Sequence, residues 1–405
     1  MVPRVLLLTQ KAPGRGKVGH IFLRELCMLY PHDRICCFHV NPIPEYEKSP
    51  ELDWLPTKFV PAPPERGYTR LGRYVARLSR PVLERYVELI EIPSLLAQVV
   101  QFGKAHNVDL IWATLSSPTT LRLAKAVADS LRVPLVTTVW DPPAYKMKQY
   151  HPDQYALSRL LQTFATTLKA SVRSGVASEG MKRRYEQDYG TDCGVMIYAP
   201  ERPAEVSLCP GTSKNKNVVI GLAGSIYAVE EWNAFLTALA RRNWRIAGRD
   251  VIVRILSESL PKLTAKPQWI EFLGWRDPID TVRLLAEADI AYLPYWFDSA
   301  YEEVVQLAFP NKLATYVAAR VPVLYHGPRD SSPMAFFQRF PVGIGCHSLE
   351  PDEIVASLER LTTDAEFSLR ARRACDEAYH QELNAVVFRR RFAELMGVQE
   401  DELLR

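Results

Sequence analysis

Residues 309–325, FPNKLATYVAARVPVLY, constrain the fold more than any other stretch of the chain. Pro310 is tolerated in a first helical turn, residues 312–319 favour a helix, and residues 321–325 are β-branched and apolar, as in a buried strand. A second apolar run, residues 288–294, ends in a proline just upstream. Together they predict a helix–strand step of a parallel sheet. The strand end, the loop and the helix start then meet at the carboxyl edge of the sheet, where open α/β sheets bind ligands.

The predicted helix start favours an anion. The first N–H groups of a helix point outward without partners, and Lys312 adds a full positive charge beside them. A phosphate-bearing ligand is therefore the first expectation for this edge.

The rest of the chain repeats the alternation of strand and helix, which is typical of parallel sheets covered by helices. The first half predicts strands at 4–9, 34–40, 109–114, 134–140, 172–177 and 194–198. A proline-rich stretch, residues 41–66, is predicted to be an irregular loop. The second half predicts strands at 218–223, 250–256, 269–273, 288–294, 321–325 and 342–346. Helices are predicted at 21–30, 68–107, 119–131, 155–170, 180–189, 230–242, 278–287, 352–361, 365–379 and 384–396.

Length and composition agree with two α/β domains. A chain of 405 residues exceeds the usual size of one core. We predict domains at 1–200 and 218–380, joined by a Pro-, Gly-, Ser- and Lys-rich linker at 201–217 that serves as a hinge. Residues 381–405 form a last segment. The short apolar run near the start predicts a first strand rather than a signal peptide, and no run reaches the length of a membrane span.

The seven cysteines, an odd number without metal-type spacing, are typical of a reducing compartment, so we expect a cytoplasmic protein. Cys36 and Cys37 lie in an apolar strand and are predicted to pack in the core. A net charge of +4 gives no reason to expect nucleic acid as a partner.

One basic stripe stands out from this nearly balanced charge. Its members recur at helical spacing and are Arg66, Arg70, Arg73, Arg77 and Arg80. Apolar residues take the opposite face, so the stretch predicts an amphipathic helix. Such a helix suits an anionic membrane surface on the inner face of a membrane. The alternative is a surface helix whose apolar face packs on its own domain.

Residues 309–325 resemble the donor-site helix of GT-B glycosyltransferases, especially the family-four group. The matching pattern consists of Pro310, Lys312, Leu313, Tyr316, Ala318, Pro322 and Val323. Three further segments resemble that family's motifs in the same order: the segment ASEGM from Ala177, GLAGSIY from Gly221, and FLGW from Phe272. The resemblance implies two Rossmann-like domains facing a cleft, and a C-terminal helix, residues 384–396, that crosses back to the first domain. A simple surface helix is the alternative for that last element.

The resemblance also implies a donor site for a nucleotide-diphosphate sugar. Gly224 and Ser225 open a loop whose backbone can approach a diphosphate, and Gly274 and Trp275 correspond to the family's base-binding turn. The loop and helix predicted from Pro310 onward add four residues to this donor site: Pro310, Asn311, Lys312 and Thr315. Arg254 carries a charge that needs solvent or an anion at the sheet edge.

Acceptor-side candidates lie in the first domain. The glycine-rich loop at residues 11–20 faces the acceptor in GT-B enzymes, which makes Gly19 and His20 candidates, although a structural turn is equally open. Trp140 and Asp141 end a predicted strand before two prolines. Trp140 can stack on a sugar, and Asp141 can orient an acceptor hydroxyl or act as a base; the alternative is an Asp that caps the next turn.

The chain departs from the family pattern where two glutamates eight positions apart are usual. Leu307 and Thr315 occupy those positions. Glu303, with Glu302, lies slightly earlier and is a candidate for the catalytic carboxylate if the loop folds inward; a solvated acidic pair is the alternative. Lys312 is then the main group expected to stabilise the leaving diphosphate.

We therefore predict a metal-independent, retaining glycosyltransferase of polysaccharide biosynthesis without a cofactor, since no ligand cluster has metal spacing. Its partners are a nucleotide sugar and a glycan, lipid-linked or small-molecule acceptor. Two alternatives stay open: another GT-B enzyme, such as an inverting transferase or an epimerase, and a non-catalytic GT-B subunit that binds a sugar nucleotide or a partner transferase.

Overall fold

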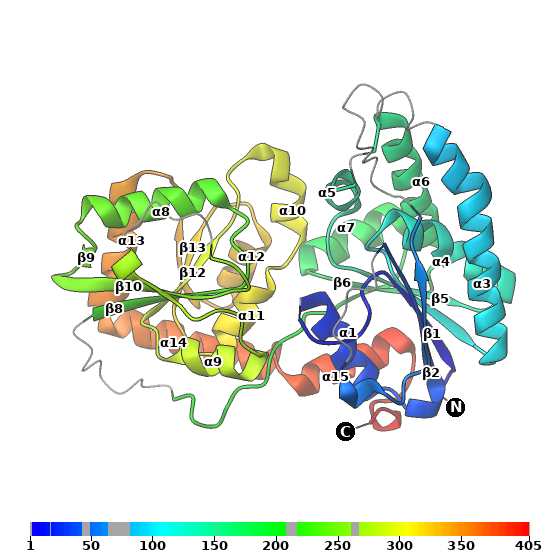
Figure 1. Ribbon diagram of the computed structural model, residues 1–405. Coiled ribbons are helices and arrows are strands. Elements are labelled where there is room, and N and C mark those ends of the chain that lie inside the picture. Colours follow the sequence, from blue (N-terminus) through cyan, green and yellow to red (C-terminus); the bar gives the residue numbers. More distant parts are fainter. Residues whose placement is uncertain are drawn as a thin grey trace. The chain divides into compact units, whose positions relative to one another are not determined.

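A computed structural model describes residues 2–16, 18–42, 49–63, 82–150, 152–207, 217–260 and 267–404. The chain divides into two compact units (Figure 1). Unit 1 comprises Met1–Met196 and Arg389–Arg405, and unit 2 comprises Ile197–Phe388. Each unit is an α/β domain built on a parallel sheet, as the alternation predicts.

Unit 1 contains a seven-stranded sheet in the order β3-β2-β1-β4-β5-β6-β7. Every neighbouring pair is parallel. The chain moves outward from β1 in both directions, so β1 and β4 flank the point where the strand order reverses, the usual ligand position in open α/β sheets. The strands are β1 (Val5–Thr9), β2 (Ile35–Asn41), β3 (Thr57–Pro61), β4 (Leu110–Thr114), β5 (Leu135–Val139), β6 (Arg173–Val176) and β7 (Cys193–Val195).

Helices connect these strands and start or stop at local signals. Ser117, Asp153 and Ser178 each accept a first-turn N–H at a helix start, and Gly190 ends α7 at φ 68°. The helices are α1 (Val18–Leu29), α3 (Ile92–Ala105), α4 (Pro118–Leu131), α5 (Pro143–Lys148), α6 (Gln154–Ala170) and α7 (Glu179–Tyr189). A π-helical turn, Val87–Glu91, precedes α3. The short helix α5 was not predicted; Pro143 begins it at a position that tolerates proline.

The prediction of an irregular loop at 41–66 is wrong at Thr57–Pro61, which forms β3. Among the described strands it pairs with β2 alone, and it is only half-buried. Pro61 at its end suits an edge strand, where a missing N–H costs no ladder bond. Tertiary pairing with β2 thus forms a strand that the flanking prolines conceal in the sequence.

The C-terminal helix α15 (Ala385–Met396) crosses from unit 2 into unit 1. Within unit 1 the Phe392 ring lies 5.4 Å from that of Trp112 and 6.1 Å from that of Tyr30. Arg173 Nε donates to the Leu395 carbonyl at 2.8 Å. The last residues of the chain therefore complete the core of the first domain.

Unit 2 repeats the topology of unit 1. Its main path is β11-β10-β8-β12-β13-β14, with every neighbouring pair parallel, and β9 (Arg245–Ile246) pairs antiparallel with β10. The strand order reverses between β8 and β12. The strands are β8 (Asn217–Ala223), β10 (Arg249–Leu256), β11 (Ile270–Phe272), β12 (Ile290–Pro294), β13 (Val323–His326) and β14 (Gly343–Cys346).

The helices of unit 2 pack an aromatic core against this sheet. Phe235 stacks on Tyr292 at 4.1 Å, and Trp232 lies beside both rings. The helices are α8 (Val229–Arg241), α9 (Pro278–Ala286), α10 (Glu302–Leu307), α11 (Asn311–Ala318), α12 (Ser332–Arg339), α13 (Pro351–Thr363) and α14 (Ala365–Gln381). Both α10 and α12 are too short for a clear helical period and were not predicted.

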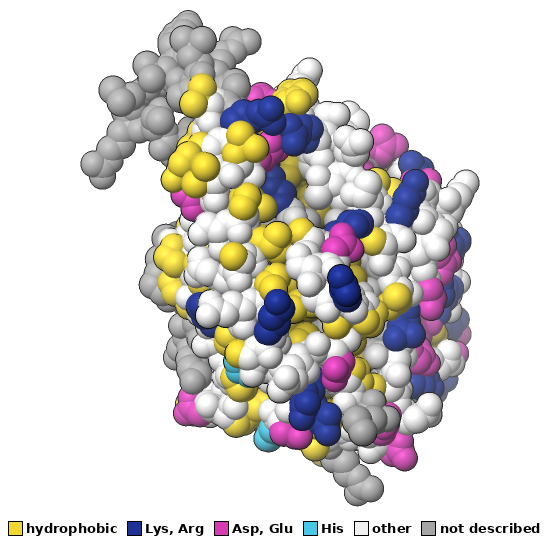
Figure 2. All heavy atoms as spheres, turned by 90° about the vertical axis from the view of Figure 1, so that its right-hand side faces the viewer, with side chains coloured by type: hydrophobic (Ala, Val, Ile, Leu, Met, Phe, Trp, Pro, Cys, Tyr) yellow, Lys and Arg dark blue, Asp and Glu magenta, His cyan; other side chains and the backbone are white. Residues whose placement is uncertain are grey.

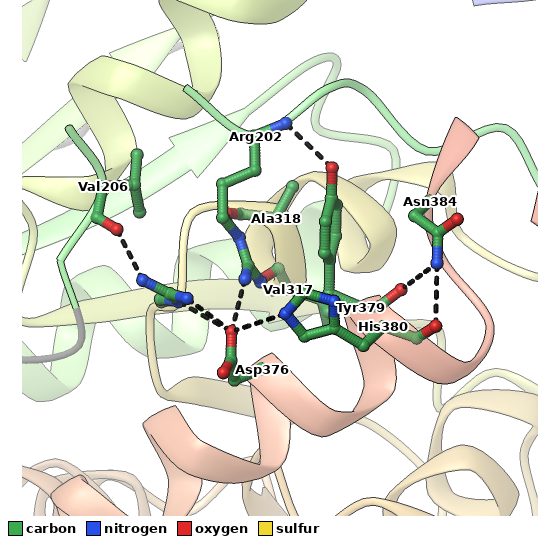
Figure 3. Close-up of polar contacts among 9 residues, drawn as sticks. Arg202, Val206, Val317, Ala318, Asp376, Tyr379, His380 and Asn384 are labelled. Carbon is green, nitrogen blue, oxygen red and sulfur yellow. Dashed lines mark hydrogen bonds and ion pairs between the residues drawn. The ribbon is translucent and has the colours of Figure 1, made fainter. Parts of the chain in front are cut away.

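The segment before β8 is held to unit 2 by hydrogen bonds as far as Val206, whose carbonyl accepts from Arg320 (Figure 3). Arg202 donates to the Ala318 carbonyl at 2.8 Å and to the Val317 carbonyl at 3.1 Å, which caps the C-terminus of α11. Asp376 accepts from Arg202 at 2.5 Å and from Arg320 at 2.6 Å. The predicted linker at 201–217 thus begins with anchored residues, and residues 208–216 lie outside the described part of the chain.

Three further sequence expectations concern the adjacent cysteines, membrane-spanning helices and the arginine stripe. Cys36 and Cys37 are buried in β2, which confirms core packing, and burial raises the pKa of both thiols. No helix among the described residues is long and apolar enough to cross a membrane. The arginine stripe from Arg66 to Arg80 lies outside the described residues.

Candidate active site

The best-formed candidate site lies at the carboxyl ends of β8 and β12, where the strand order of unit 2 reverses. Gly224 and Ser225 follow β8. Gly224 has φ +73°, a left-handed conformation that favours glycine. Its N–H donates to the Leu256 carbonyl at 2.7 Å, so the N–H of Ser225, rather than that of Gly224, is the donor that this turn offers to a ligand.

Lys312 lies in the first turn of α11 and extends to this loop. Its ammonium donates to the Ser225 carbonyl and lies 4.4 Å from the centre of the Tyr227 ring. In the described part of the chain no carboxylate forms a salt bridge with it. Burial lowers the pKa of Lys312 to about 7. A half-buried ammonium without a counterion is well suited to bind an anion.

The helix start adds its own donors. Pro310 is the N-cap of α11 and makes no side-chain cap, and the first turn contains no acidic residue. The N–H groups of Asn311 and Lys312 therefore have no partner within the helix. Thr315 lies one turn later and donates its hydroxyl to the Asn311 carbonyl at 3.4 Å. The structure thus brings Ser225, Asn311 and Lys312 together.

An aromatic column holds the loop after β12 against the loop after β8. Trp296 donates to the Tyr227 carbonyl at 3.2 Å, and the two rings lie 4.5 Å apart. Tyr301 stacks on the other side of Trp296 at 4.7 Å. Sequence reasoning gave Trp296 and Tyr301 no role; the aromatic run YWFDSAY, residues 295–301 after β12, was the available signal.

A buried carboxylate also holds the loop after β12. Glu231 is 2% exposed and accepts the N–H of Phe297 at 2.7 Å. Burial raises the pKa of Glu231. The sequence gave no indication of this contact, because residues 231 and 297 are distant along the chain. Glu231 therefore positions the loop that carries Trp296.

Other donor-side predictions fall further along the sheet. Gly274, at φ +74°, follows β11, and Trp275 beside it is 43% exposed and accepts from the Arg276 guanidinium at its carbonyl at 2.9 Å. Arg254 differs from its expectation, because Glu271 and Glu287 accept from its guanidinium at 2.6 and 2.8 Å. Two carboxylates of the same domain therefore meet its charge.

Glu303 is exposed in the first turn of α10, next to the exposed Glu302. Gln306, one turn on, donates to Glu302 at 3.3 Å and to Asp330 at 2.7 Å. Within the described residues no group of three or more His, Cys, Asp or Glu side chains is arranged to hold a metal ion.

The matching edge of unit 1 holds the acceptor candidates. Trp140 makes an edge-on contact with Phe22 at 5.4 Å, and the Lys11 ammonium lies 5.3 Å from its ring centre. Lys11 also covers Gly19, and His20 hydrogen-bonds through Nδ1 to the Ala12 carbonyl at 2.7 Å. Trp140, Gly19 and Lys11 therefore lie together.

Two buried polar atoms at this edge have no hydrogen-bond partner among the described residues. They are Nε1 of Trp140 and Oγ of Ser116. Ser116 and Trp140 each lie two positions after one of the paired strand residues Thr114 and Thr138. Asp141 is half-buried, and the N-cap of the following helix is Pro142 without a side-chain cap. Asp141 therefore does not serve as the cap of α5.

These observations define a class of protein: two α/β domains of the same topology, one of which presents a cationic helix start at its sheet edge. No family model and no curated protein sequence matches the chain. Solved structures match nearly all of it. Anabaena Alr3699/HepE in complex with UDP has a TM-score of 0.63 at 16% identity, covering 97% of this chain and 99% of its own.

Two further structures give the same result. An α,α-trehalose-6-phosphate synthase of Burkholderia multivorans has a TM-score of 0.61 at 11% identity, covering 98% of this chain and 97% of its own. WaaG, described as a glycosyltransferase of lipopolysaccharide biosynthesis, has a TM-score of 0.58 at 12% identity, covering 97% and 100%. The chain has the GT-B fold, with two Rossmann-like domains and a C-terminal helix that crosses back to the first.

Proposed function

We propose that this protein is a glycosyltransferase that uses a nucleotide-diphosphate sugar as donor. The observation that carries the proposal is the half-buried Lys312 at the uncapped start of α11, bonded to the Ser225 carbonyl at the reversal point of the sheet. Free N–H groups, the helix dipole and a cation that pairs with no carboxylate of the described residues together suit a diphosphate. The similar HepE structures contain UDP, and one contains UDP and glucose, so a uridine donor is the first to test.

In this proposal the bond between the sugar C1 and the diphosphate oxygen breaks, and an acceptor hydroxyl oxygen bonds to C1. The charge that develops on the diphosphate is stabilised by Lys312 and by the N–H groups of Ser225 and Asn311. Gly274 and Trp275 hold the base. The transfer proceeds with retention and without a metal ion or cofactor.

The acceptor is a glycan, a lipid-linked sugar or a small molecule, as in polysaccharide biosynthesis. Trp140 stacks on it, and Asp141 orients its hydroxyl or takes up its proton. Trp140 Nε1 and Ser116 Oγ support this part of the proposal, because buried donors are normally paired and a hydroxyl-rich ligand supplies partners. Glu303 remains the candidate carboxylate near the transferred sugar.

A non-catalytic GT-B subunit is the second candidate. Leu307 has no charge, and the Thr315 hydroxyl is directed to the Asn311 carbonyl. Such a subunit would bind a sugar nucleotide or a partner transferase without turnover.

Calorimetric titration with UDP, ADP and GDP, and with UMP, AMP and GMP, tests the donor site. We expect one nucleoside diphosphate to bind at least about tenfold more tightly than its monophosphate, because the second phosphate meets Lys312. Product release from the matching sugar nucleotide then separates the enzyme from the non-catalytic subunit. Absence of binding by every diphosphate, in protein shown to be folded, would overturn the donor site itself.

A further inference from the structure

The loop between β12 and α10 is fixed on both sides of Trp296. Before the tryptophan, the Tyr295 N–H donates to the His326 carbonyl at 2.8 Å. After it, the Phe297 N–H donates to the buried Glu231 carboxylate at 2.7 Å. His326 ends β13 and Glu231 lies in α8, so two separate elements of unit 2 hold the backbone beside this side chain. The packed domain therefore determines where the Trp296 indole lies.

The Trp296 indole lies between two tyrosine rings. The centre of the Tyr227 ring is 4.5 Å from that of Trp296, and the Tyr301 ring stacks on Trp296 at 4.7 Å with an angle of 11° between the planes. Near-parallel aromatic rings at this separation attract each other. The indole N–H also donates to the Tyr227 carbonyl at 3.2 Å. Trp296 thus holds both the ring and the backbone of Tyr227.

Tyr227 needs this support because it lies in an irregular loop. Residues 225–228 belong to no helix or strand, and Ala228, the N-cap of α8, makes no side-chain cap. The contacts with Trp296 join this loop to the loop after β12. Without them, the Tyr227 ring would be less restricted in its position.

The Tyr227 ring in turn faces the Lys312 ammonium. The ammonium lies 4.4 Å from the ring centre and donates to the Ser225 carbonyl. A Cβ added to Gly224 would lie 3.8 Å from Lys312 Cε, so the lysine side chain runs past this turn. The face of an aromatic ring attracts a cation, because its π electrons carry negative charge. The ring therefore helps to hold the ammonium beside the loop that is proposed to bind the donor diphosphate.

On the basis of the proposed donor site at Lys312, we propose that Trp296 is a positioning residue for the diphosphate. By holding Tyr227 against the Lys312 ammonium, it determines how strongly the site prefers a nucleoside diphosphate to the monophosphate. Trp296 acts through Tyr227 and Lys312 and does not itself bind the phosphates. A monophosphate lacks the phosphate that meets Lys312, so its affinity does not depend on Trp296.

Calorimetric titration of the full chain with the pairs UDP/UMP, ADP/AMP and GDP/GMP tests this role. For the pair whose diphosphate the wild type prefers, Trp296→Leu should reduce the preference by about threefold to tenfold, because the ammonium loses its aromatic support. Affinity for the monophosphate should be unchanged. Trp296→Phe keeps a ring beside Tyr227 and should recover part of the preference. A general defect of the fold would instead weaken the binding of both nucleotides alike.

A double-mutant cycle shows whether Trp296 acts through Lys312. Lys312→Ala removes the ammonium, so adding Trp296→Leu to it should not reduce the diphosphate preference further. Tyr227→Leu removes the ring that faces the ammonium and leaves Trp296 in place. It should match the loss seen with Trp296→Leu, and it replaces that variant if Trp296→Leu does not fold.

Two controls change side chains outside the donor site. Trp269→Leu removes a half-buried tryptophan of unit 2 that stacks on Trp244 at 6.2 Å. Figure 2 shows hydrophobic side chains exposed on the face of unit 1 that carries α3 and α6. Leu89→Ala removes an apolar side chain of that unit, which is 63% exposed in the turn before α3. Both controls should keep the wild-type diphosphate preference, with circular dichroism and melting temperature measured for every variant.

The outcomes separate the donor site from the role of Trp296. A wild type that binds no diphosphate more tightly than its monophosphate overturns the donor site at Lys312, and the role of Trp296 with it. A wild type with the preference, beside a folded Trp296→Leu variant that keeps it in full, overturns the positioning role alone. Losses that add in the double variant, or equal weakening of diphosphate and monophosphate binding, also overturn that role.

Discussion

The two sheets have the same topology, yet their ligand-side edges differ. At the edge of unit 2 the loops are joined: Lys312 bonds to Ser225, Trp296 bonds to Tyr227, and Glu231 holds Phe297. At the edge of unit 1, Trp140 Nε1 and Ser116 Oγ have no partner among the described residues. The loops of the unit 2 edge are joined before a ligand binds, whereas the unit 1 edge retains two buried side-chain atoms that have no partner among the described residues.

The difference indicates how affinity is gained at each edge. A preformed anion site loses little conformational entropy on binding, so its ligand is held mainly by charge. An edge with buried unpaired donors gains when a ligand supplies acceptors, because an unmet buried donor costs about 1–3 kcal/mol. Five experiments separate the two edges.

Loss of the Lys312 ammonium should have the largest effect. We expect Lys312→Ala to reduce turnover by about 100- to 1000-fold, because the leaving diphosphate loses its principal cation. The melting temperature should change little or rise, since a half-buried ammonium without a carboxylate partner is removed. Kinetics with the donor sugar nucleotide, beside thermal unfolding, measures both. Unchanged turnover would remove Lys312 from the donor site.

Loss of Asp376 should weaken the support of the donor edge. Burial opposes its ionisation, yet hydrogen bonds from Arg320 and Arg202 hold the pKa of Asp376 below its ordinary value. Asp376→Ala leaves two largely buried guanidinium groups unpaired and should cost about 3 kcal/mol in the free energy of unfolding. Asp352→Ala, which removes an exposed pair at 3.8 Å, is the control and should cost well under about 1 kcal/mol. Equal losses in urea denaturation would contradict the anchoring role.

The pH dependence of nucleotide binding sharpens the comparison. The pKa of Lys312 is about 7 in the unliganded protein against 10.5 ordinarily. Between these values the unfolded chain binds more protons, so the contribution of this group to stability rises with pH. Diphosphate binding favours the charged form, so above pH 7 affinity should fall by up to about tenfold per pH unit with uptake of a proton. Calorimetry in buffers of different ionisation enthalpy measures that uptake, which Lys312→Met should abolish.

Trp140→Phe tests the edge of the unit 1 sheet, where the indole N–H has no partner among the described residues. Phenylalanine keeps a ring against Phe22 and removes the unpaired N–H. We expect the KM for an acceptor that supports turnover to rise by about fivefold to tenfold, since one hydrogen bond is worth about 1 kcal/mol. Nucleotide affinity and unfolding free energy should be maintained. A loss of stability with an unchanged acceptor KM would mean that Trp140 only packs the core.

Gly224→Ala should give the smallest effect. Its added Cβ would meet Lys312 Cε at 3.8 Å, an ordinary contact, so the cost comes from φ +73°. We expect a loss of about 1 kcal/mol in the free energy of unfolding. Gly194→Ala, at a glycine with open space and no positive φ, is the matched control and should show no loss. Chemical denaturation of both variants measures the difference.

Local patterns predicted most elements of both sheets. Buried strands such as β1 and β12 are short apolar runs, and caps such as Ser178 and Gly190 mark helix ends, so their signals lie within a few residues. The strand β3 escaped prediction because it is half-buried and depends on pairing with β2. The helices α10 and α12 escaped because neither shows a clear helical period; α11 is as short as α12 but was predicted from Pro310 and the helix-forming residues that follow it.

The residues of the candidate site also divide into those predicted from local sequence and those that were not. The glycine turn at Gly224 lies in one short local motif, and the start of α11 with Lys312 lies in another. Both were predicted from these motifs. The aromatic column at Trp296 and the buried Glu231 were not, because their partners are more than sixty residues away in the chain. The two carboxylate partners of Arg254 were not predicted for the same reason, since Glu271 and Glu287 reach it only in the folded domain.

The sequence by itself determined the alternation of strand and helix, the existence of two parallel sheets, and the position of Lys312 at a loop between strand and helix. These properties follow from side-chain period and from backbone preferences that act over a few residues. Only the tertiary structure decided which charged side chains form ion pairs and that burial lowers the pKa of Lys312. It also decided that Trp140 Nε1 and Ser116 Oγ have no partner among the described residues. Such properties depend on burial and on distant partners, and packing alone brings those together.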